Sequence, residues 1–115
     1  MIVVSDLNAA AALYGQTFGL KSGPPQLAPD LQATRLRFDT GNAYVDVVQP
    51  ASEASPLGQF LKDRGEGIYL IAVQVDDLEG TLTTLRQRGA EIHVEAGRTF
   101  ISPKTTHGAL MELIE

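Results

Sequence analysis

The C-terminal segment Gly108-Ala109-Leu110-Met111-Glu112-Leu113-Ile114-Glu115 decides how the rest of the chain is interpreted. It is typical of a strongly apolar strand, yet it carries one acid, Glu112, in its middle. A carboxylate in a core strand needs a partner, because burying it unpaired costs several kcal/mol or forces it to be neutral. The same pattern occurs at Asp46 in Tyr44-Val45-Asp46-Val47-Val48. We therefore interpret Asp46 and Glu112 as equivalent positions of one duplicated unit.

The composition excludes several kinds of partner and site. The chain has 115 residues, of which 43% are hydrophobic and 20% charged, and a net charge of −5 with no basic run. Nucleic acid and anionic membranes are therefore not expected partners. There is no cysteine, which excludes disulfides and thiolate ligands and fits a cytoplasmic protein. Because strand-like residues begin at once with Met1-Ile2-Val3-Val4, we expect the native chain to extend upstream of Met1.

The predicted elements of the first half are a strand, a helix and further strands. Ile2–Val4 predicts a buried strand, and an Ala-rich helix follows from Asn8 to about Thr17. The Pro-containing stretch Lys21–Asp30 indicates a loop or an irregular edge strand. Strands are predicted over Thr34–Phe38 and Ala43–Val48, with hairpin-turn residues between them.

The second half repeats this order after a linker. In the linker, Ser55-Pro56 starts a short helix that ends at Arg64-Gly65. The elements predicted beyond it are a strand over Ile68–Val75, a helix capped by Asp77, and strands over Glu91–Val94, Arg98–Ser102 and Gly108–Glu115.

Matching segments support a duplication. Val4-Ser5-Asp6-Leu7 matches Val75-Asp76-Asp77-Leu78, and Asn42–Val48 matches Gly108–Ile114. We predict an α+β fold of tandem βαβββ modules, in which a curved mixed or antiparallel sheet forms a cup with helices on its outer face. The whole chain, 1–115, is predicted to be a single domain. Module one spans about 1–50, the linker and short helix about 51–65, and module two about 66–115.

Strand alternation assigns the side chains to the two faces of the predicted sheet. Val45, Val47, Met111 and Leu113 should face the helices, which leaves Asp46 and Glu112 on the opposite, ligand-facing side. A mostly apolar cup with a few charged groups is typical of a small-molecule site. The substrate-binding candidates on this side are Arg35, Arg37, Tyr44, Leu70, Gln74 and Phe100.

These motifs resemble the vicinal-oxygen-chelate superfamily, which has the glyoxalase and bleomycin-resistance fold. The resemblance covers the whole chain and is closest to the methylmalonyl-CoA epimerase branch. Its most specific segments are Val3–Leu7, Ser55–Leu57, Arg64–Ile68, Ala72–Leu78 and Ser102–Leu113.

The resemblance implies one divalent metal, which binds vicinal oxygens of the substrate while a carboxylate moves a proton. Glu112 matches the last metal ligand, and Asp46 occupies a Glu/Gln ligand position with a side chain one methylene shorter. Leu70 stands where a third ligand, His, is expected, and the first His would fall upstream of Met1. Sites of this type use three protein ligands or more, so Glu112 and Asp46 alone form an incomplete set.

Each candidate also has a structural interpretation. Asp46 and Glu112 are either ligands and proton carriers or acids neutralised by Arg35 or Arg37. The two arginines either grip an anionic substrate or simply pair with the acids. The apolar Leu70 favours an apolar or aromatic ligand over a hydrated metal. His107 is expected to be an exposed turn residue and His93 a structural or exposed strand residue.

Three functions therefore remain open. The first is a metal-assisted isomerase, epimerase or lyase, similar to methylmalonyl-CoA epimerase or lactoylglutathione lyase, with Glu112 and Asp46 as catalytic groups. The second is metal-independent binding or sequestration of a small molecule by the same fold. The third is an assembly domain without a ligand. In the first two cases we expect a small-molecule ligand in the cup. A homodimer is expected for the chain in general.

Overall fold

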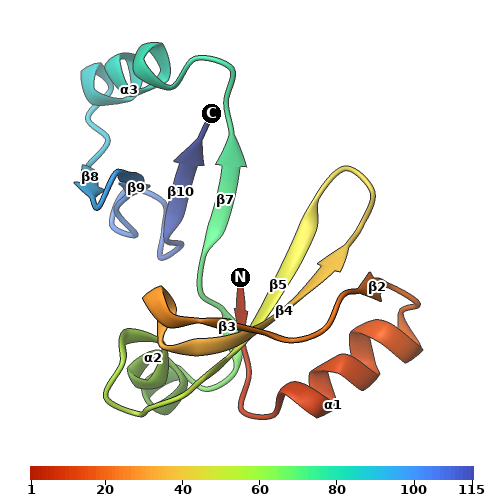
Figure 1. The fold of residues 1–115 in the computed structure, drawn as a ribbon. Helices are drawn as coiled ribbons and strands as arrows, with labels where there is room; N and C mark the ends of the chain where they lie inside the picture. Colours follow the sequence, from red (N-terminus) through yellow and green to blue (C-terminus); the bar gives the residue numbers. More distant parts are fainter. The chain divides into compact units, whose positions relative to one another are not determined.

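Strand pairing divides the chain into two mixed sheets, the first accompanied by two α-helices and the second by one, which confirms the predicted α+β class (Figure 1). The computed structural model describes residues 1–115. They form two compact units, Met1–Tyr69 (unit 1) and Leu70–Glu115 (unit 2), which are described separately. None of the helices combines the length and the apolar character of a membrane span.

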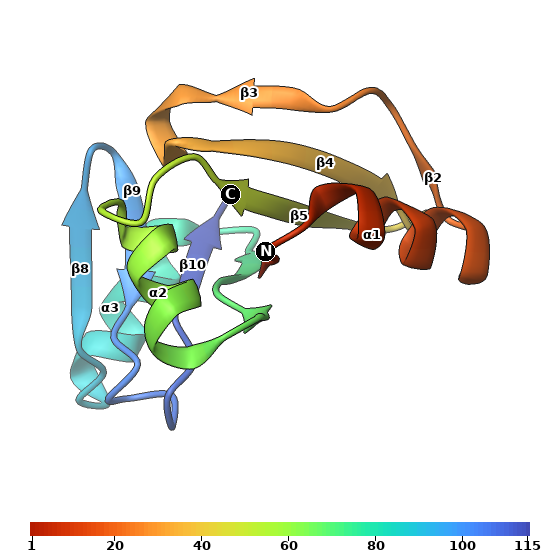
Figure 2. The same cartoon turned by 90° about the horizontal axis from the view of Figure 1, so that it is seen from below.

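Unit 1 contains a sheet with the strand order β2-β4-β5-β1-β6, and β3 pairs with β4. Figure 2 shows β3, β4 and β5 of this sheet and the helix α1 from below. The elements of unit 1 are β1 (Ile2–Val3), α1 (Leu7–Ala11), the helical turn η1 (Ala12–Thr17), β2 (Lys21–Ser22), β3 (Gln26–Ala28), η2 (Pro29–Leu31), β4 (Ala33–Asp39), β5 (Tyr44–Pro50), α2 (Pro56–Arg64) and β6 (Gly67–Ile68).

Unit 2 contains a four-stranded sheet with the order β7-β10-β9-β8. Its helix α3 begins after the cap Asp77, as predicted, and keeps Leu78, Leu82 and Leu85 half-buried on one side. The elements of unit 2 are β7 (Ile71–Gln74), α3 (Leu78–Gln87), β8 (Ile92–Glu95), β9 (Arg98–Ile101) and β10 (Met111–Ile114).

The two sheets share the pairing of the first and last strand of each module, residue by residue. In each, the first strand runs parallel to the last strand: β1 pairs with β5 and β7 with β10. Ile2 lies opposite Val47 in unit 1, and Val73 lies opposite Leu113 in unit 2. This register makes Asp46 and Glu112, which precede Val47 and Leu113, equivalent positions.

Equivalent backbone hydrogen bonds hold the strand ends. The Val4 amide donates to the Val48 carbonyl at 2.9 Å, and the Val75 amide donates to the Ile114 carbonyl at 2.7 Å. These pairs follow the same offsets as the matched sequence segments. The predicted duplication therefore extends to individual hydrogen bonds.

The start of each long helix is also held in the same way. In unit 1 the Leu7 amide donates to Gln49 Oε1 at 2.8 Å, and in unit 2 the Leu78 amide donates to Glu115 Oε2 at 3.1 Å. Gln49 lies near the end of β5, and Glu115 directly follows β10. Each acceptor satisfies one of the amides that the first helical turn leaves without a partner in the helix.

One face of the unit 1 sheet is covered by α1, as alternation predicted. Leu36, Phe38 and Val47 are buried together with Leu7 and Ala10 of the helix. Since neighbouring strand residues point to opposite faces, Arg37 and Asp46 lie on the other side of the sheet. The core therefore fixes which face carries the charged side chains.

The predicted strand Ile68–Val75 is wrong, because the chain breaks it at the boundary between the units. Ile68 ends β6, which pairs with β1, whereas Ile71 begins β7, which pairs with β10. The Tyr69 amide donates to the Met1 carbonyl at 2.8 Å, and the Ile71 amide donates to the Leu110 carbonyl at 3.0 Å. One continuous apolar segment thus contributes strands to two different sheets.

The predicted helix Asn8–Thr17 is helical but not uniformly α. Residues Ala12–Thr17 form wider π turns, and the Phe18 amide donates to the Leu13 carbonyl at 3.0 Å. Tyr14, in this segment, contacts both Phe18 and Phe38 through ring centroids 5.5 and 5.6 Å apart. The π turns occur where these rings pack, a feature that residue spacing does not predict.

Candidate functional site

In unit 1, a two-pronged ion pair joins Arg37 on β4 to Asp46 on β5. The strands place the two residues directly opposite each other. Arg37 Nε lies 2.6 Å from Asp46 Oδ1, and Nη2 lies 2.8 Å from Oδ2. Asp46 is buried at 7% exposure, whereas 47% of the Arg37 side chain is exposed. Both carboxylate oxygens are thus occupied by one guanidinium.

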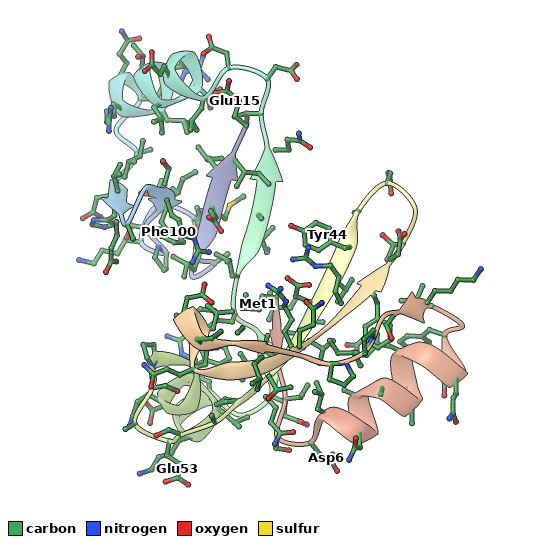
Figure 3. The ribbon with its side chains drawn as sticks, in the orientation of Figure 1. Met1, Asp6, Tyr44, Glu53, Phe100 and Glu115 are labelled. Atoms are coloured by element: carbon green, nitrogen blue, oxygen red, sulfur yellow. The ribbon has the colours of Figure 1, made fainter.

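The Arg37 guanidinium is supported on a second side by Tyr44. Its central carbon lies 3.8 Å from the centroid of the Tyr44 ring, a cation–π contact. Tyr44 projects from the start of β5 and is half-exposed (Figure 3). The hydrogen bonds from Arg37 to Asp46 raise the pKa of Arg37, which therefore stays charged at any physiological pH.

Unit 2 repeats this ion pair with different residues. Arg98 Nε on β9 lies 2.8 Å from Glu112 Oε1 on β10, and Nη2 lies 2.7 Å from Oε2. Glu112 is buried at 8% exposure, and the Arg98 side chain is 39% exposed. Arg98 also lies 5.0 Å from the ring centroid of Phe100, which Figure 3 shows on β9. We call Arg37–Asp46 and Arg98–Glu112 the two forks.

The lengths of the two acids follow from strand geometry. Asp46 faces Arg37 directly, so a short side chain suffices. Glu112 is opposite Phe100, and Arg98 lies two residues before Phe100 on the same strand face. This pair is diagonal, and diagonal neighbours on a sheet are farther apart than opposed ones. The additional methylene of Glu112 helps it to reach across the diagonal.

A hollow of about 530 Å³ lies in unit 1 beside the β4–β5 turn. Arg37, Lys21 and Tyr44 are on its wall, so the exposed part of the fork faces this pocket. Asp39, which pairs with Lys21 in the β2–β4 register, contributes an opposing charge. The remaining lining residues are Ser22, Gly23, Gly41, Asn42 and Ala43. Its volume is typical of small-molecule sites.

The residues predicted for substrate binding are only partly brought together. Arg37 and Tyr44 contact each other beside Asp46, whereas Arg35 points its Nη2 to Gln26 Oε1 at 3.5 Å and does not pair with an acid. In unit 2, Leu70 is buried at 6% exposure and precedes β7. Gln74 is exposed at the end of β7.

Neither histidine lies in the acid-bearing strand pairs. His93 is exposed on β8, and His107 is exposed in a turn with a φ of 58°. Both positions agree with the structural interpretations of these residues.

Arg98 is the residue that the sequence analysis missed. A strand over Arg98–Ser102 was predicted, but its faces were not assigned. Alternation would have placed Arg98 on the same side as Phe100, which was already a candidate. That signal was sufficient to find the second fork.

The donor set of each unit does not fit a metal ion. No three His, Asp or Glu side chains within a unit are grouped so that they could hold a metal. In addition, the two acids at the implied ligand positions have both oxygens engaged by arginine. Metal binding by Asp46 or Glu112 would have to break a charge-assisted pair and leave an arginine without its anion.

Comparison with known proteins identifies the family. The sequence pattern of the Glyoxalase/Bleomycin resistance protein/Dioxygenase superfamily matches residues 1–102. The chain belongs to this superfamily. The match spans unit 1 and most of unit 2, so family membership does not depend on one half of the duplication.

Within the superfamily, the chain is similar to epimerases. An ethylmalonyl-CoA/methylmalonyl-CoA epimerase of Cereibacter sphaeroides is 33% identical over 97% of this chain and 91% of that protein. The methylmalonyl-CoA epimerase structure from Mycobacterium tuberculosis is 28% identical, with a TM-score of 0.81 over 99% of this chain and 83% of that one. A Streptomyces coelicolor methylmalonyl-CoA epimerase variant, solved in complex with 2-nitronate-propionyl-CoA, is 26% identical over 97% of this chain and 90% of that one, with a TM-score of 0.76.

Proposed function

We propose that this member of the superfamily is an isomerase of the epimerase type. Its substrate would be a small carboxylic acid carried as a coenzyme A thioester, inverted at the carbon next to the thioester carbonyl. The single observation that carries this proposal is the 33% identity to an epimerase across 97% of the chain. Similarity on this scale includes both units and the strands that carry the two forks.

The forks contain the groups that such a reaction needs. A base removes the proton from the α-carbon, the electron pair moves onto the thioester oxygen, and a proton returns to the opposite face of the carbon. Asp46 and Glu112 are the candidate proton carriers. Arg37 and Arg98 are candidates to stabilise the negative oxygen, because a guanidinium donates paired hydrogen bonds to oxyanions.

Proton exchange in heavy water tests this proposal directly. Methylmalonyl-CoA of one configuration is incubated with the full chain in D₂O, and the α-proton signal is followed by NMR against an enzyme-free control. We expect accelerated loss of the signal together with formation of the other epimer. Glu112→Gln and Asp46→Asn should show which acid carries the proton, by lowering the rate about 100-fold or more. Exchange no faster than in the enzyme-free control would contradict the proposal.

A second candidate function is metal-independent binding of a small anionic molecule without turnover. The specific observation in its favour is that each acid accepts two hydrogen bonds from an arginine. Its carboxylate oxygens are therefore engaged and not free to accept a proton from a substrate. In this case methylmalonyl-CoA would raise the melting temperature by mass action while its α-proton stayed in place. The exchange experiment separates the two candidates.

We also propose that the chain forms a homodimer and acts in the cytoplasm. The dimer is supported by exposed apolar side chains on edge strands, Leu27 on β3 and Val94 on β8. The absence of cysteine fits a reducing compartment.

A further inference from the structure

The two acids that the family resemblance implies as metal ligands are instead paired with arginines. Asp46 and Glu112 occupy the two positions at which the family resemblance implies a metal ligand. In both units a guanidinium donates hydrogen bonds to the two carboxylate oxygens instead, and it does so through the same pair of nitrogen atoms, Nε and Nη2. The two acids stand at equivalent positions, whereas their arginines reach them from different strand positions, and each acid is nevertheless held by a guanidinium.

From this geometry we infer that Arg37 is an oxyanion-binding residue that supplies, without a metal, the positive charge of the unit 1 site. Its ligand would be a carboxylate or phosphate group that enters the 530 Å³ pocket. This inference rests on the proposed function in one respect only, which is that the carboxylate or phosphate belongs to a coenzyme A thioester. In unit 2, Arg98 holds the equivalent acid Glu112, although it stands two residues before Phe100, the strand position that corresponds to Arg37.

The orientation of Arg37 is set by its partners. Asp46 takes the Nε–H and one Nη2–H, and the Tyr44 ring covers a face of the guanidinium. Of the five N–H groups of an arginine, those on Nη1 are not used in the fork. Because the side chain is 47% exposed and lines the pocket, a ligand can approach it there. The ligand would meet a guanidinium that is already ordered, which reduces the entropy lost on binding.

The pocket adds few competing charges. Lys21 contributes a second cation, and Asp39 a single anion whose Oδ1 accepts a hydrogen bond from the Gly41 amide at 2.7 Å. Asn42 and Ser22 add neutral hydrogen-bonding side chains. This set suits one oxyanion with a polar attachment better than a free cation.

Calorimetric titration of the full chain, purified without a polyhistidine tag, tests the inference. The probes are methylmalonate, which presents carboxylates, and adenosine 3′,5′-bisphosphate, which presents the phosphates of the coenzyme A portion. We expect at least one probe to bind with the same Kd in the presence and absence of EDTA. We also expect titrated Ni²⁺, Co²⁺, Mn²⁺ and Zn²⁺ to give no stoichiometric binding. The probe that binds identifies the source of the oxyanion.

Three variants assign the binding to Arg37. Arg37→Met should weaken the binding probe at least tenfold, which corresponds to about 1.4 kcal/mol. Arg37→Lys keeps the charge but loses the forked geometry, so it should not restore the wild-type Kd. Arg64→Met, the same substitution at an exposed helix position of unit 1, should leave the Kd unchanged. If Arg37→Met does not fold, the comparison of Arg37→Lys with wild type decides.

Several results would overturn the inference. They are wild-type affinity in Arg37→Met or Arg37→Lys, no binding of either probe, and stoichiometric metal that is lost in Asp46→Ala. The exchange experiment is a separate readout. Oxyanion binding without α-proton exchange keeps this inference and removes the isomerase. Exchange catalysed by a chain that binds neither probe, or that binds a probe with unchanged Kd in Arg37→Met, keeps the isomerase and removes this inference.

Discussion

The fork of unit 2 shows how a single residue pair supports a buried acid. Glu112 is only 8% exposed, and Arg98 neutralises it through both oxygens. Removing one partner of such a pair leaves an uncompensated charge, whereas replacing both with apolar residues removes the need for compensation. The stability of the fold therefore depends on whether the buried Glu112 keeps its arginine.

This difference gives a prediction for Arg98. Arg98→Met should lower the free energy of unfolding by about 1–3 kcal/mol, less than for a fully buried pair because 39% of the Arg98 side chain is exposed. The double variant Arg98→Met/Glu112→Leu should lose less than the single one. Urea unfolding measures both, with the exposed Arg86→Met as a control that stays within about 0.5 kcal/mol of wild type. A double variant less stable than the single one would contradict the account.

A close backbone approach gives the second prediction at this scale. A Cβ on Gly58 in α2 would lie 2.0 Å from the Ser52 carbonyl oxygen and 2.8 Å from the Glu53 Cα. Gly58→Ala should therefore destabilise the chain by about 1–3 kcal/mol, despite the better helix propensity of alanine. Gly67→Ala, where nothing lies within 4 Å of the added Cβ, is the matched control. Chemical unfolding of both variants tests whether the linker packs this closely.

At the residue scale, the sequence was sufficient to find both acids and to limit the partner of Asp46 to two arginines. Asp46 and Glu112 stood out because a charge in an apolar strand is unusual, and alternation placed both Arg35 and Arg37 on their side of the sheet. Whether Arg35 or Arg37 was the partner could not be predicted, since both lie on the same strand face. The strand register decided it, because it sets Arg37 and not Arg35 opposite Asp46.

Among the elements, the β8–β9 hairpin has a turn whose sequence is not the preferred one. Glu95 and Arg98 pair across a two-residue loop, Ala96-Gly97, and both loop residues have positive φ, 51° and 76°. A two-residue loop of this type is normally Asn-Gly, because asparagine adopts the left-handed region at lower cost than alanine.

Ala96→Asn should therefore stabilise the chain by about 0.5–1 kcal/mol. The opposite substitution at the neighbouring position, Gly97→Ala, should destabilise it by about 1 kcal/mol, since it adds a Cβ at a φ of 76°. Thermal and urea unfolding of the two variants should shift in opposite directions. A shift of both in the same direction would show that the turn conformation is not what limits stability.

Elements with clear start and stop signals were predicted well. The caps Ser55 and Asp77 each accept an amide hydrogen bond at the start of a helix, from Gly58 and Gly80 at 3.1 Å. The prediction of one strand over Ile68–Val75 was wrong because the hydrophobic pattern does not indicate which sheet a strand joins. That information lies in distant partners, Met1 and Leu110, which local sequence cannot identify.

At the scale of the whole molecule, the sheet edges predict self-association. Leu27, Ile68 and Val94 are 81%, 63% and 63% exposed, and each lies on a strand with only one neighbour. Exposed apolar side chains on edge strands favour pairing with another chain. Sedimentation should therefore give twice the 12.3 kDa chain mass.

Substitutions at the edges locate the contact. Leu27→Lys and Val94→Lys place a charge on different edge strands, and at least one of them should shift the sedimentation mass to that of the monomer. Thr83→Lys, on the exposed surface of α3, should leave the mass unchanged. A wild-type chain that sediments as a monomer at all concentrations would remove the dimer proposal.

The parallel pairing of the first and last strands has a consequence for gene architecture. Because β1 lies beside β5, and β7 beside β10, each half of the chain starts and finishes at neighbouring places in its own sheet. The gene segment that encodes such a half, here called a cassette, can be duplicated in tandem, since a short connection suffices to join one copy of the half to the next. The same adjacency would let new chain ends be opened elsewhere in a cassette after its original ends are joined. The site residues could then diverge in one copy while the hydrogen bonds that close each copy stayed the same.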